Sequence, residues 1–449
     1  MSEKVSIKEK VSYALANLGN IPIQTTLSSY LLIFYTNVVG LDPAACATLF
    51  LIARILDGLN DPIVGFIIDH IPTGKMGHFR PTLMLGTLLC SINFLLLWFG
   101  PLMATSGKLV IAYVSYLLIG ILFPIMDISL NSLLPVMTSD ADERNALSSL
   151  KGFVYMLGMF GLNMIAPLVI GDTTVAGGYK KLIILVTCIV FVFSELGALG
   201  VKERVQMPPS QEKYKIADLF RILFKRPVLT TFLSNLFYNM SIFAMNASLA
   251  YFFTYVLGNL ALLSVVSVVQ LVALLPATIL VGKLIRRFGK KNTYVAGLLI
   301  IGLFPLIRLI NVTNIPLLMI ATAVTGFASG LCMPLAYGIQ ADNTDYIELD
   351  MGQRAEGAIS SLSSFVTKCA MGIGGAIPGY MLAAVHFDAT AATQPDAVLT
   401  VVIMCAIVVP AIGSLLGAIV MKFGYPLDKA DLEEQNRRIA EIRAEQQDM

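Results

Sequence analysis

Residues 44–69 read AACATLFLIARILDGLNDPIVGFIID, and this stretch decides the class of fold. It is almost wholly apolar and exceeds the roughly 20 residues that a helix needs to cross the hydrocarbon core of a bilayer. Backbone groups in lipid must satisfy their own hydrogen bonds, so a run of this length predicts a helix and not a barrel strand. Ionisable residues inside such a run are costly, so Arg54, Asp57 and Asp61 need partners or a function.

The apolar character continues along the whole chain. Of its 449 residues 56% are hydrophobic and only 13% are charged, and the mean hydropathy is +0.77, whereas about a quarter of an average soluble chain is charged. These values predict an all-α integral membrane protein and exclude a soluble enzyme with one anchor or a disordered chain. We expect spans at 15–36, 44–68, 82–100, 109–134, 150–170, 182–200, 229–257, 262–284, 294–311, 315–339, 357–384 and 398–422.

The basic residues set the orientation of these twelve spans. An even number of spans puts both termini on one side, and most of the 31 Lys and Arg residues then fall in segments that share a side with the termini. The positive-inside rule therefore predicts cytoplasmic N- and C-termini. Only Lys108, Lys180 and Lys181 fall on the opposite side.

A long polar connector divides the chain into two sets of six spans. We predict an N-terminal six-helix bundle at 1–200, a cytoplasmic central loop at 201–227, a C-terminal six-helix bundle at 228–424 and a cytoplasmic tail at 425–449. The two halves also echo each other, as the repeats of transporters do; the alternative is that any short cytoplasmic turn carries Gly and basic residues. The division into six and six spans favours the major facilitator fold. The echo pairs Gly65-x3-Asp69 and Gly77-His78-Phe79-Arg80 with Gly282-x3-Arg286 and Gly289-Lys290-Lys291.

The charges of the second span suggest a cation site. Arg54, Asp57 and Asp61 stand at i, i+3 and i+7 and share one helical face. Two carboxylates so close repel each other, and a bound Na+ or a proton relieves that repulsion; Asn60 could add an oxygen ligand. The alternative is that Arg54 pairs with Asp57 and only locks the helices together.

Further polar residues in the spans are candidates for substrate binding and gating. Asp127 is an isolated acid in span 4, suited to accepting hydrogen bonds from vicinal hydroxyls, and Lys368 in span 11 could be its partner. Asn239 of span 7 could line the same cavity or join helices. Asp69, Arg80 and Arg354 look like elements of a cytoplasmic gate, with solvated loops as the alternative.

The run from Tyr30 to Asp69, GKMGHFRP and RAEGAISSLSSFVTK together resemble the glycoside-pentoside-hexuronide:cation symporter family of the major facilitator superfamily. The resemblance implies that Asp57 and Asp61 bind the coupling cation, as metal ligands if it is Na+, and that Asn60 tunes the choice of cation. It implies a sugar-binding role for Asp127, and it places Lys368 near both sites.

The chain departs from this family at the sugar site. Where the family's best-known member has a second sugar-binding acid in helix 1, this chain has Ile21, beside Asn20; a stacking aromatic of helix 4 aligns with Asn131, and an arginine of helix 5 aligns with Lys151. These changes leave the cation residues in place and put the substrate in doubt: another glycoside, an acidic sugar read by Lys151, or a non-sugar solute.

The sequence as a whole predicts a monomeric, multi-pass transporter of a bacterial inner membrane. It would import a small hydroxylated solute, such as a sugar or glycoside, with Na+ or H+ by alternating access, surrounded by lipid and without a cofactor or nucleic-acid partner. An exporter of a non-sugar solute on the same scaffold is the main rival. An enzyme is disfavoured because the three histidines and the cysteines form no catalytic or zinc-binding pattern.

Overall fold

A computed structural model describes residues 5–69, 71, 74, 76–138, 140–204, 221–352, 356–391 and 393–447. The named elements within these ranges are all helices, as expected for a chain whose backbone must satisfy itself in lipid. The first half contains α1 (Ile7–Phe34), continued by a π-turn at Tyr35–Val39, then α2 (Pro43–Asp69), α3 (Phe79–Met103), α4 (Lys108–Met137), α5 (Ala141–Ile170) and α6 (Ala176–Gly200).

The second half has the same long helices. It contains α8 (Arg226–Tyr251) with a π-turn at Phe252–Val256, α9 (Leu262–Leu303) with a 3-10 segment at Phe304–Ile310, α10 (Ile315–Met351) and α11 (Glu356–Ala384). The last span is α12 (Asp396–Ile403), a π-turn at Met404–Val408, α13 (Val409–Ile419) and a π-turn at Val420–Gly424, followed by the tail helix α14 (Lys429–Gln447).

Each of the twelve predicted spans is helical. Eight helices among the described residues are long and apolar enough to cross a membrane, and the longest, Leu262–Ile310, contains two of the predicted spans. The fold class is confirmed, while the number twelve itself stays a prediction. Most of the central connector, at 205–220, lies outside the described residues.

Local chemistry explains where the helices begin and turn. Ser6 caps α1: its Oγ accepts a hydrogen bond from the Glu9 backbone N–H, and the Glu9 carboxylate accepts one from the Ser6 N–H in return. Gly77, between α2 and α3, and Gly289, inside α9, have φ values of 98° and 80°, which only glycine adopts without strain. The sequence echo between the halves therefore corresponds to two breaks in helical geometry, one between α2 and α3 and one at a kink inside α9, and both need glycine.

The structure forms two compact units. Unit 1 comprises Met1–Pro209, Asn246–Ser267 and Gly375–Val401; unit 2 comprises Ser210–Met245, Val268–Gly374 and Val402–Met449. The short segments join unit 1 through tyrosines: Tyr251 and Tyr255 bond to Thr36 and Asn37 at 2.6 and 2.7 Å. The unit boundaries cut α8, α9, α11 and α12, and the division at 201–227 stays a prediction.

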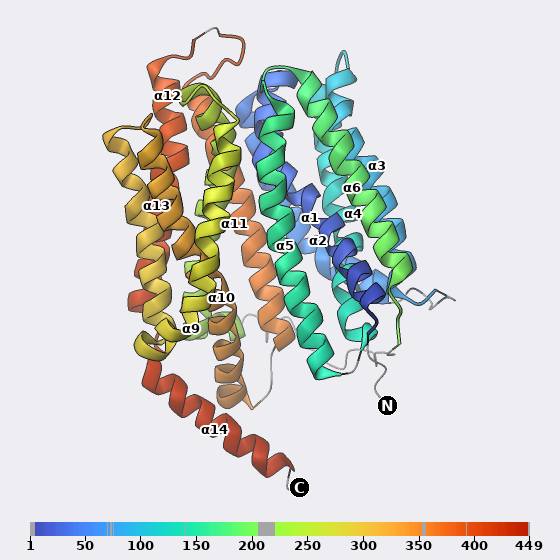
Figure 1. Ribbon diagram of the computed structural model, residues 1–449, viewed down its shortest axis with the longest axis vertical. Helices are drawn as coiled ribbons and strands as arrows, with labels where there is room; N and C mark the ends of the chain where they lie inside the picture. Colours follow the sequence, from blue (N-terminus) through green and yellow to red (C-terminus); the bar gives the residue numbers. More distant parts are fainter. Residues whose placement is uncertain are drawn as a thin grey trace. The chain divides into compact units, whose positions relative to one another are not determined.

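Within unit 1, α1 to α6 run side by side (Figure 1) and approach closely where small residues meet. A Cβ added at Gly197 or Gly200 of α6 would overlap Ala16 or Ser12 of α1. Such close packing leaves no room between α1 and α6 for a substrate.

Unit 2 has its own buried core around Tyr238, Tyr294 and Tyr425. The tail helix α14 buries one edge, at Leu432, Gln435 and Ile439. Gln435 Nε2 donates to the carbonyl oxygen of Asp342 on α10 at 2.8 Å. The tail is thus attached to the end of α10.

Candidate functional site

The charged face predicted for the second span lies on α2, which is continuous. Arg54 and Asp57 are both 5% exposed, and Arg54 Nη1 donates to Asp57 Oδ2 at 2.9 Å. Each charge needs the other, because an unpaired buried charge costs several kcal/mol. The pairing that the sequence left as the structural alternative is therefore present, and the cation-binding role of Asp57 stays a prediction.

Three residues that the sequence did not single out surround this pair. Gln24 of α1 accepts a hydrogen bond from Arg54 Nη2 at 3.4 Å. The Arg54 guanidinium lies over the Tyr116 ring of α4, 5.6 Å from its centroid, a favourable cation–π geometry. A Cβ added at Gly120 of α4 would overlap Asp57 Oδ1. One carboxylate oxygen of Asp57 thus meets Arg54 and the other lies against the α4 backbone.

A second polar cluster, which we call the relay, joins α1, α4 and α5. Asn20 Nδ2 donates to Asp127 Oδ1 at 2.6 Å, and Asn131 Nδ2 donates to Asp127 Oδ2 at 3.0 Å. Lys151 Nζ in turn donates to Asn131 Oδ1. Four residues proposed for substrate binding are therefore contiguous, although the sequence named Asn131 and Lys151 only through a family resemblance. Their roles in binding stay predictions.

The relay alternates donors and acceptors. Asp127 contributes one negative charge and Lys151 one positive charge, and Asn131 bridges them. Asn20 is 7% exposed, and its Oδ1 is buried without a hydrogen-bond partner among the residues that the structure describes. A buried acceptor of this kind costs free energy until a donor reaches it, so Asn20 is suited to accept a hydrogen bond from a ligand hydroxyl.

Two helix faces connect the Arg54–Asp57 pair with the relay. Asn20 and Gln24 are one turn apart on α1, and one contacts Asp127 while the other contacts Arg54. On α4, Gly120 and Asp127 are seven residues apart, which places them on the same face about 10 Å apart along the axis. The two clusters are thus neighbours joined through α1 and α4.

Ile21 occupies the position where the resemblance suggested a missing sugar-binding acid. Its side chain is 6% exposed and fills the space beside Gly158 of α5, where an added Cβ would come within 2.9 Å of Ile21 Cδ1. Position 21 is therefore a packing position between α1 and α5 in this chain. The polar surface of α1 is supplied by Asn20.

The other predicted site residues lie outside these two clusters or outside the described residues. Lys368, on α11, is half-buried, and Asn239, on α8, donates to the Asn235 carbonyl oxygen at 2.9 Å; both belong to unit 2. Asn60 is half-buried on α2, one turn after Asp57. The side chains of Asp61 and Asp69, and all of Arg354, lie outside the described residues.

No group of three or more His, Cys, Asp or Glu side chains that could hold a metal occurs among the residues that the structure describes. An ion held by Asp57 would need the carboxylate of Asp61, oxygens from amides such as Asn60, or backbone carbonyls. These hard oxygen ligands suit Na+, and a Na+ site does not require three or more His, Cys, Asp or Glu side chains.

Arg80, predicted as a gate residue, bonds within unit 1. Its Nε and Nη2 donate to the carbonyl oxygens of Ala198 and Leu199 at 2.8 and 2.9 Å, at the end of α6. In exchange, the Glu203 carboxylate, which follows α6, accepts from the backbone N–H groups of His78, Phe79 and Arg80 at the start of α3. The cationic Arg80 thus caps the C-terminus of α6, and the anionic Glu203 caps the N-terminus of α3. Glu203 was not predicted from the sequence, where its only signal was its place just after a span.

Two buried carboxyl groups outside the predicted spans have shifted pKa values. Burial tends to raise the pKa of Glu9, but hydrogen bonds from Arg204 and Ser6 outweigh it, so that the pKa lies below its usual 4.5; Arg204 Nη2 contacts both oxygens at 2.8 and 2.9 Å. Burial raises the pKa of Asp342 above its usual value despite Lys290, whose Nζ lies 2.6 Å from Asp342 Oδ1. Both pairs lie near cytoplasmic helix ends in the predicted topology.

Known proteins resemble this chain over nearly its whole length. Residues 12–429 match the family model described as MFS/sugar transport protein. The isoprimeverose transporter of Lactiplantibacillus pentosus is 34% identical over 446 residues, which cover 95% of this chain and 91% of that protein. The glucuronide carrier protein homolog of Escherichia coli (strain K12) is 28% identical over 441 residues, covering 97% and 95%. A crystal structure of a nucleoside transporter, 11% identical, shares the fold with a TM-score of 0.68 over 93% of this chain and 100% of that one.

Proposed function

The chain belongs to the MFS/sugar transport protein family, a family of membrane transporters, and on this premise we propose that it imports a sugar or glycoside together with Na+ or H+ by alternating access. The protein is a multi-pass membrane protein, and a bacterial inner membrane is its expected location. The relatives named above are a transporter of isoprimeverose and a glucuronide carrier homolog, which supports a sugar-like substrate. We propose a monomer as the transporting unit.

The relay is the observation that carries this proposal. A sugar hydroxyl both donates and accepts a hydrogen bond, and the relay offers an ionised acceptor at Asp127 and a free buried acceptor at Asn20. Asn131 and Lys151 supply donors on the other side. Because Lys151 and Asp127 balance each other, the relay favours an uncharged, hydroxyl-rich substrate over an acidic one.

We propose that the Arg54–Asp57 pair senses the coupling cation. A cation or proton that binds beside Asp57 weakens the ion pair between Asp57 and Arg54, because the new positive charge competes with the guanidinium for the carboxylate oxygens. Arg54 also bonds to Gln24, one turn from Asn20 of the relay. Cation binding can therefore change the position of α1 at the relay, and linkage requires that sugar binding change cation affinity by the same factor.

Uptake by proteoliposomes tests this function. Labelled neutral and acidic sugars are offered under an imposed Na+ gradient and, separately, under a proton gradient. Accumulation of a neutral sugar with one of the gradients supports the proposal, and accumulation of acidic sugars alone would contradict the reading of the relay. Export of a solute against the gradient, with no sugar uptake, would favour the exporter.

A further inference from the structure

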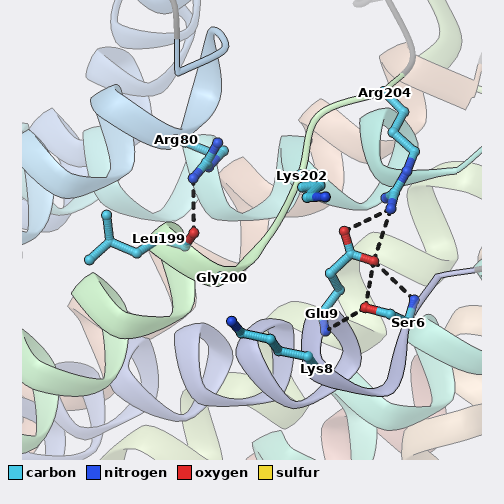
Figure 2. Close-up of a pocket in the computed structure, with 8 residues that line it drawn as sticks. All are labelled: Ser6, Lys8, Glu9, Arg80, Leu199, Gly200, Lys202 and Arg204. Carbon is cyan, nitrogen blue, oxygen red and sulfur yellow. Dashed lines mark hydrogen bonds and ion pairs between the residues drawn. The ribbon is translucent and has the colours of Figure 1, made fainter.

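A pocket of about 360 Å3 lies at one end of unit 1, away from both polar clusters. It is formed by the start of α1, the start of α3 and the residues at and after the end of α6 (Figure 2). In the predicted topology these are the cytoplasmic ends of the three helices. Its polar lining consists of Ser6, Lys8, Glu9, Arg80, Lys202 and Arg204.

The lining carries an excess of positive charge. Four of its side chains are cationic and one is a carboxylate, and that carboxylate, Glu9, is already engaged by Arg204 and Ser6. The Arg80 guanidinium is held by carbonyl oxygens of α6. Lys8 and Lys202 form no hydrogen bond or ion pair with any residue that the structure describes. Two ammonium groups therefore line the pocket without a counter-charge among the described residues.

Apolar side chains flank this charged pocket on the same helices. Leu199 lines it and is 52% exposed, and Leu196, one turn earlier on α6, is 53% exposed; Val11 on α1 is 54% exposed. Leu196 lies inside the predicted span, where its exposed surface faces lipid chains. The pocket thus joins a cationic cavity to an apolar helix surface, as a bound phospholipid would require.

We propose that the pocket binds the phosphate-bearing headgroup of an anionic phospholipid of the cytoplasmic leaflet, with an acyl chain along Leu196 and Leu199. The phosphate would accept hydrogen bonds from Lys8 and Lys202. An anionic headgroup fits better than phosphatidylethanolamine, because Glu9, the only carboxylate among the described lining residues, already holds Arg204 and is not available to an amine. The adjoining leucines favour a lipid over a free phosphate.

The test measures binding to the purified full-length protein in detergent by native mass spectrometry. The probes are phosphatidylglycerol, phosphatidylethanolamine and glycerol 3-phosphate, each titrated separately. The variant Lys8→Gln/Lys202→Gln removes both unpaired ammonium groups. The matched control is Lys283→Gln/Arg287→Gln, which removes two exposed charges from unit 2 on the same predicted side of the membrane.

We expect phosphatidylglycerol to bind the native protein more tightly than phosphatidylethanolamine does, and the Lys8/Lys202 variant to weaken it by roughly tenfold or more. The control should keep the native affinity. Equal loss in the control would show diffuse attraction to a basic surface and overturn the proposal. So would unchanged phosphatidylglycerol binding in the Lys8/Lys202 variant, or glycerol 3-phosphate binding as tightly as the lipid.

Discussion

Asn20 and Gln24 lie one turn apart on α1, and their side chains contact charged residues of two different clusters. Asn20 bonds to Asp127, and Gln24 bonds to Arg54. Pro22 lies between them and removes one hydrogen bond of the helix, so the two amides are joined by one short turn of α1. This single face of α1 is the shortest covalent link between the proposed cation and substrate sites.

The two amides should therefore have separable effects on transport. Gln24→Ala should weaken cation activation of uptake by up to about tenfold, because one hydrogen bond to a charged partner is lost. Asn20→Ala should instead raise the KM for sugar at saturating cation. Uptake kinetics with varied cation and varied sugar separate the two. Identical effects of both variants on both constants would contradict the assignment of one amide to each cluster.

Gly120 should tolerate no side chain. A Cβ there would overlap Asp57 Oδ1, so Gly120→Ala should displace the carboxylate and greatly reduce cation-driven uptake. The matched control is Gly161→Ala on α5, where nothing lies within 4 Å of the added Cβ; there alanine should be neutral or stabilising, by up to about 1 kcal/mol, because it is the better helix former. If both variants accumulate sugar like the native protein, the close contact of Asp57 with α4 has no function.

Asn131 should matter for the sugar and not for the cation. Asn131→Leu breaks the bridge between Asp127 and Lys151, and we expect a 10- to 100-fold rise in the KM for sugar, the range for losing a hydrogen bond to an ionised group. The cation concentration for half-maximal uptake should stay within about twofold. The neighbouring Ser132→Ala serves as control; a large change in that variant would point to general disturbance of α4.

Glu9 should contribute stability that depends on pH. Its pKa in the folded protein lies below its usual 4.5, because the bonds from Arg204 and Ser6 outweigh burial. A carboxylate with a lowered pKa stabilises the fold above its unfolded pKa and loses that contribution as the pH falls through the folded value. At pH 7 the melting temperature of the native protein should thus be higher than that of Glu9→Gln, and this difference should shrink below about pH 4.5. A difference that stays constant with pH would rule out the charge as its source.

The sequence predicted the helices well because spans are long apolar runs, and a backbone in lipid has few alternatives. It also placed Arg54 and Asp57 on one face, since their spacing of three residues fixes that in any helix. Gln24, Tyr116 and Gly120 were missed because each meets the pair from another helix, and no local pattern reports such a contact. Gly120 in particular reads as an ordinary small residue until the Asp57 carboxylate is found against it.

The functional reading of the polar residues was less complete for the same reason. Asp127 stood out as an acid in an apolar span, whereas Asn20 and Asn131 gained meaning only when their amides were found on either side of it. Ile21 suggested only that a sugar-binding acid was missing from helix 1, yet its side chain packs against Gly158. Glu203 lies outside the spans, and its cap on α3 depends on the chain after α6 returning to that helix.

The most direct test of cation-coupled sugar import measures cation movement when a transported sugar is added to proteoliposomes without any imposed gradient. With the native protein, the sugar should drive Na+ or H+ inward. Asp57→Asn and Asp61→Asn should show neither cation movement nor gradient-driven accumulation, while both variants remain folded and monodisperse. Sugar entry without cation movement in the native protein, or full accumulation by both variants, would contradict cation-coupled sugar import.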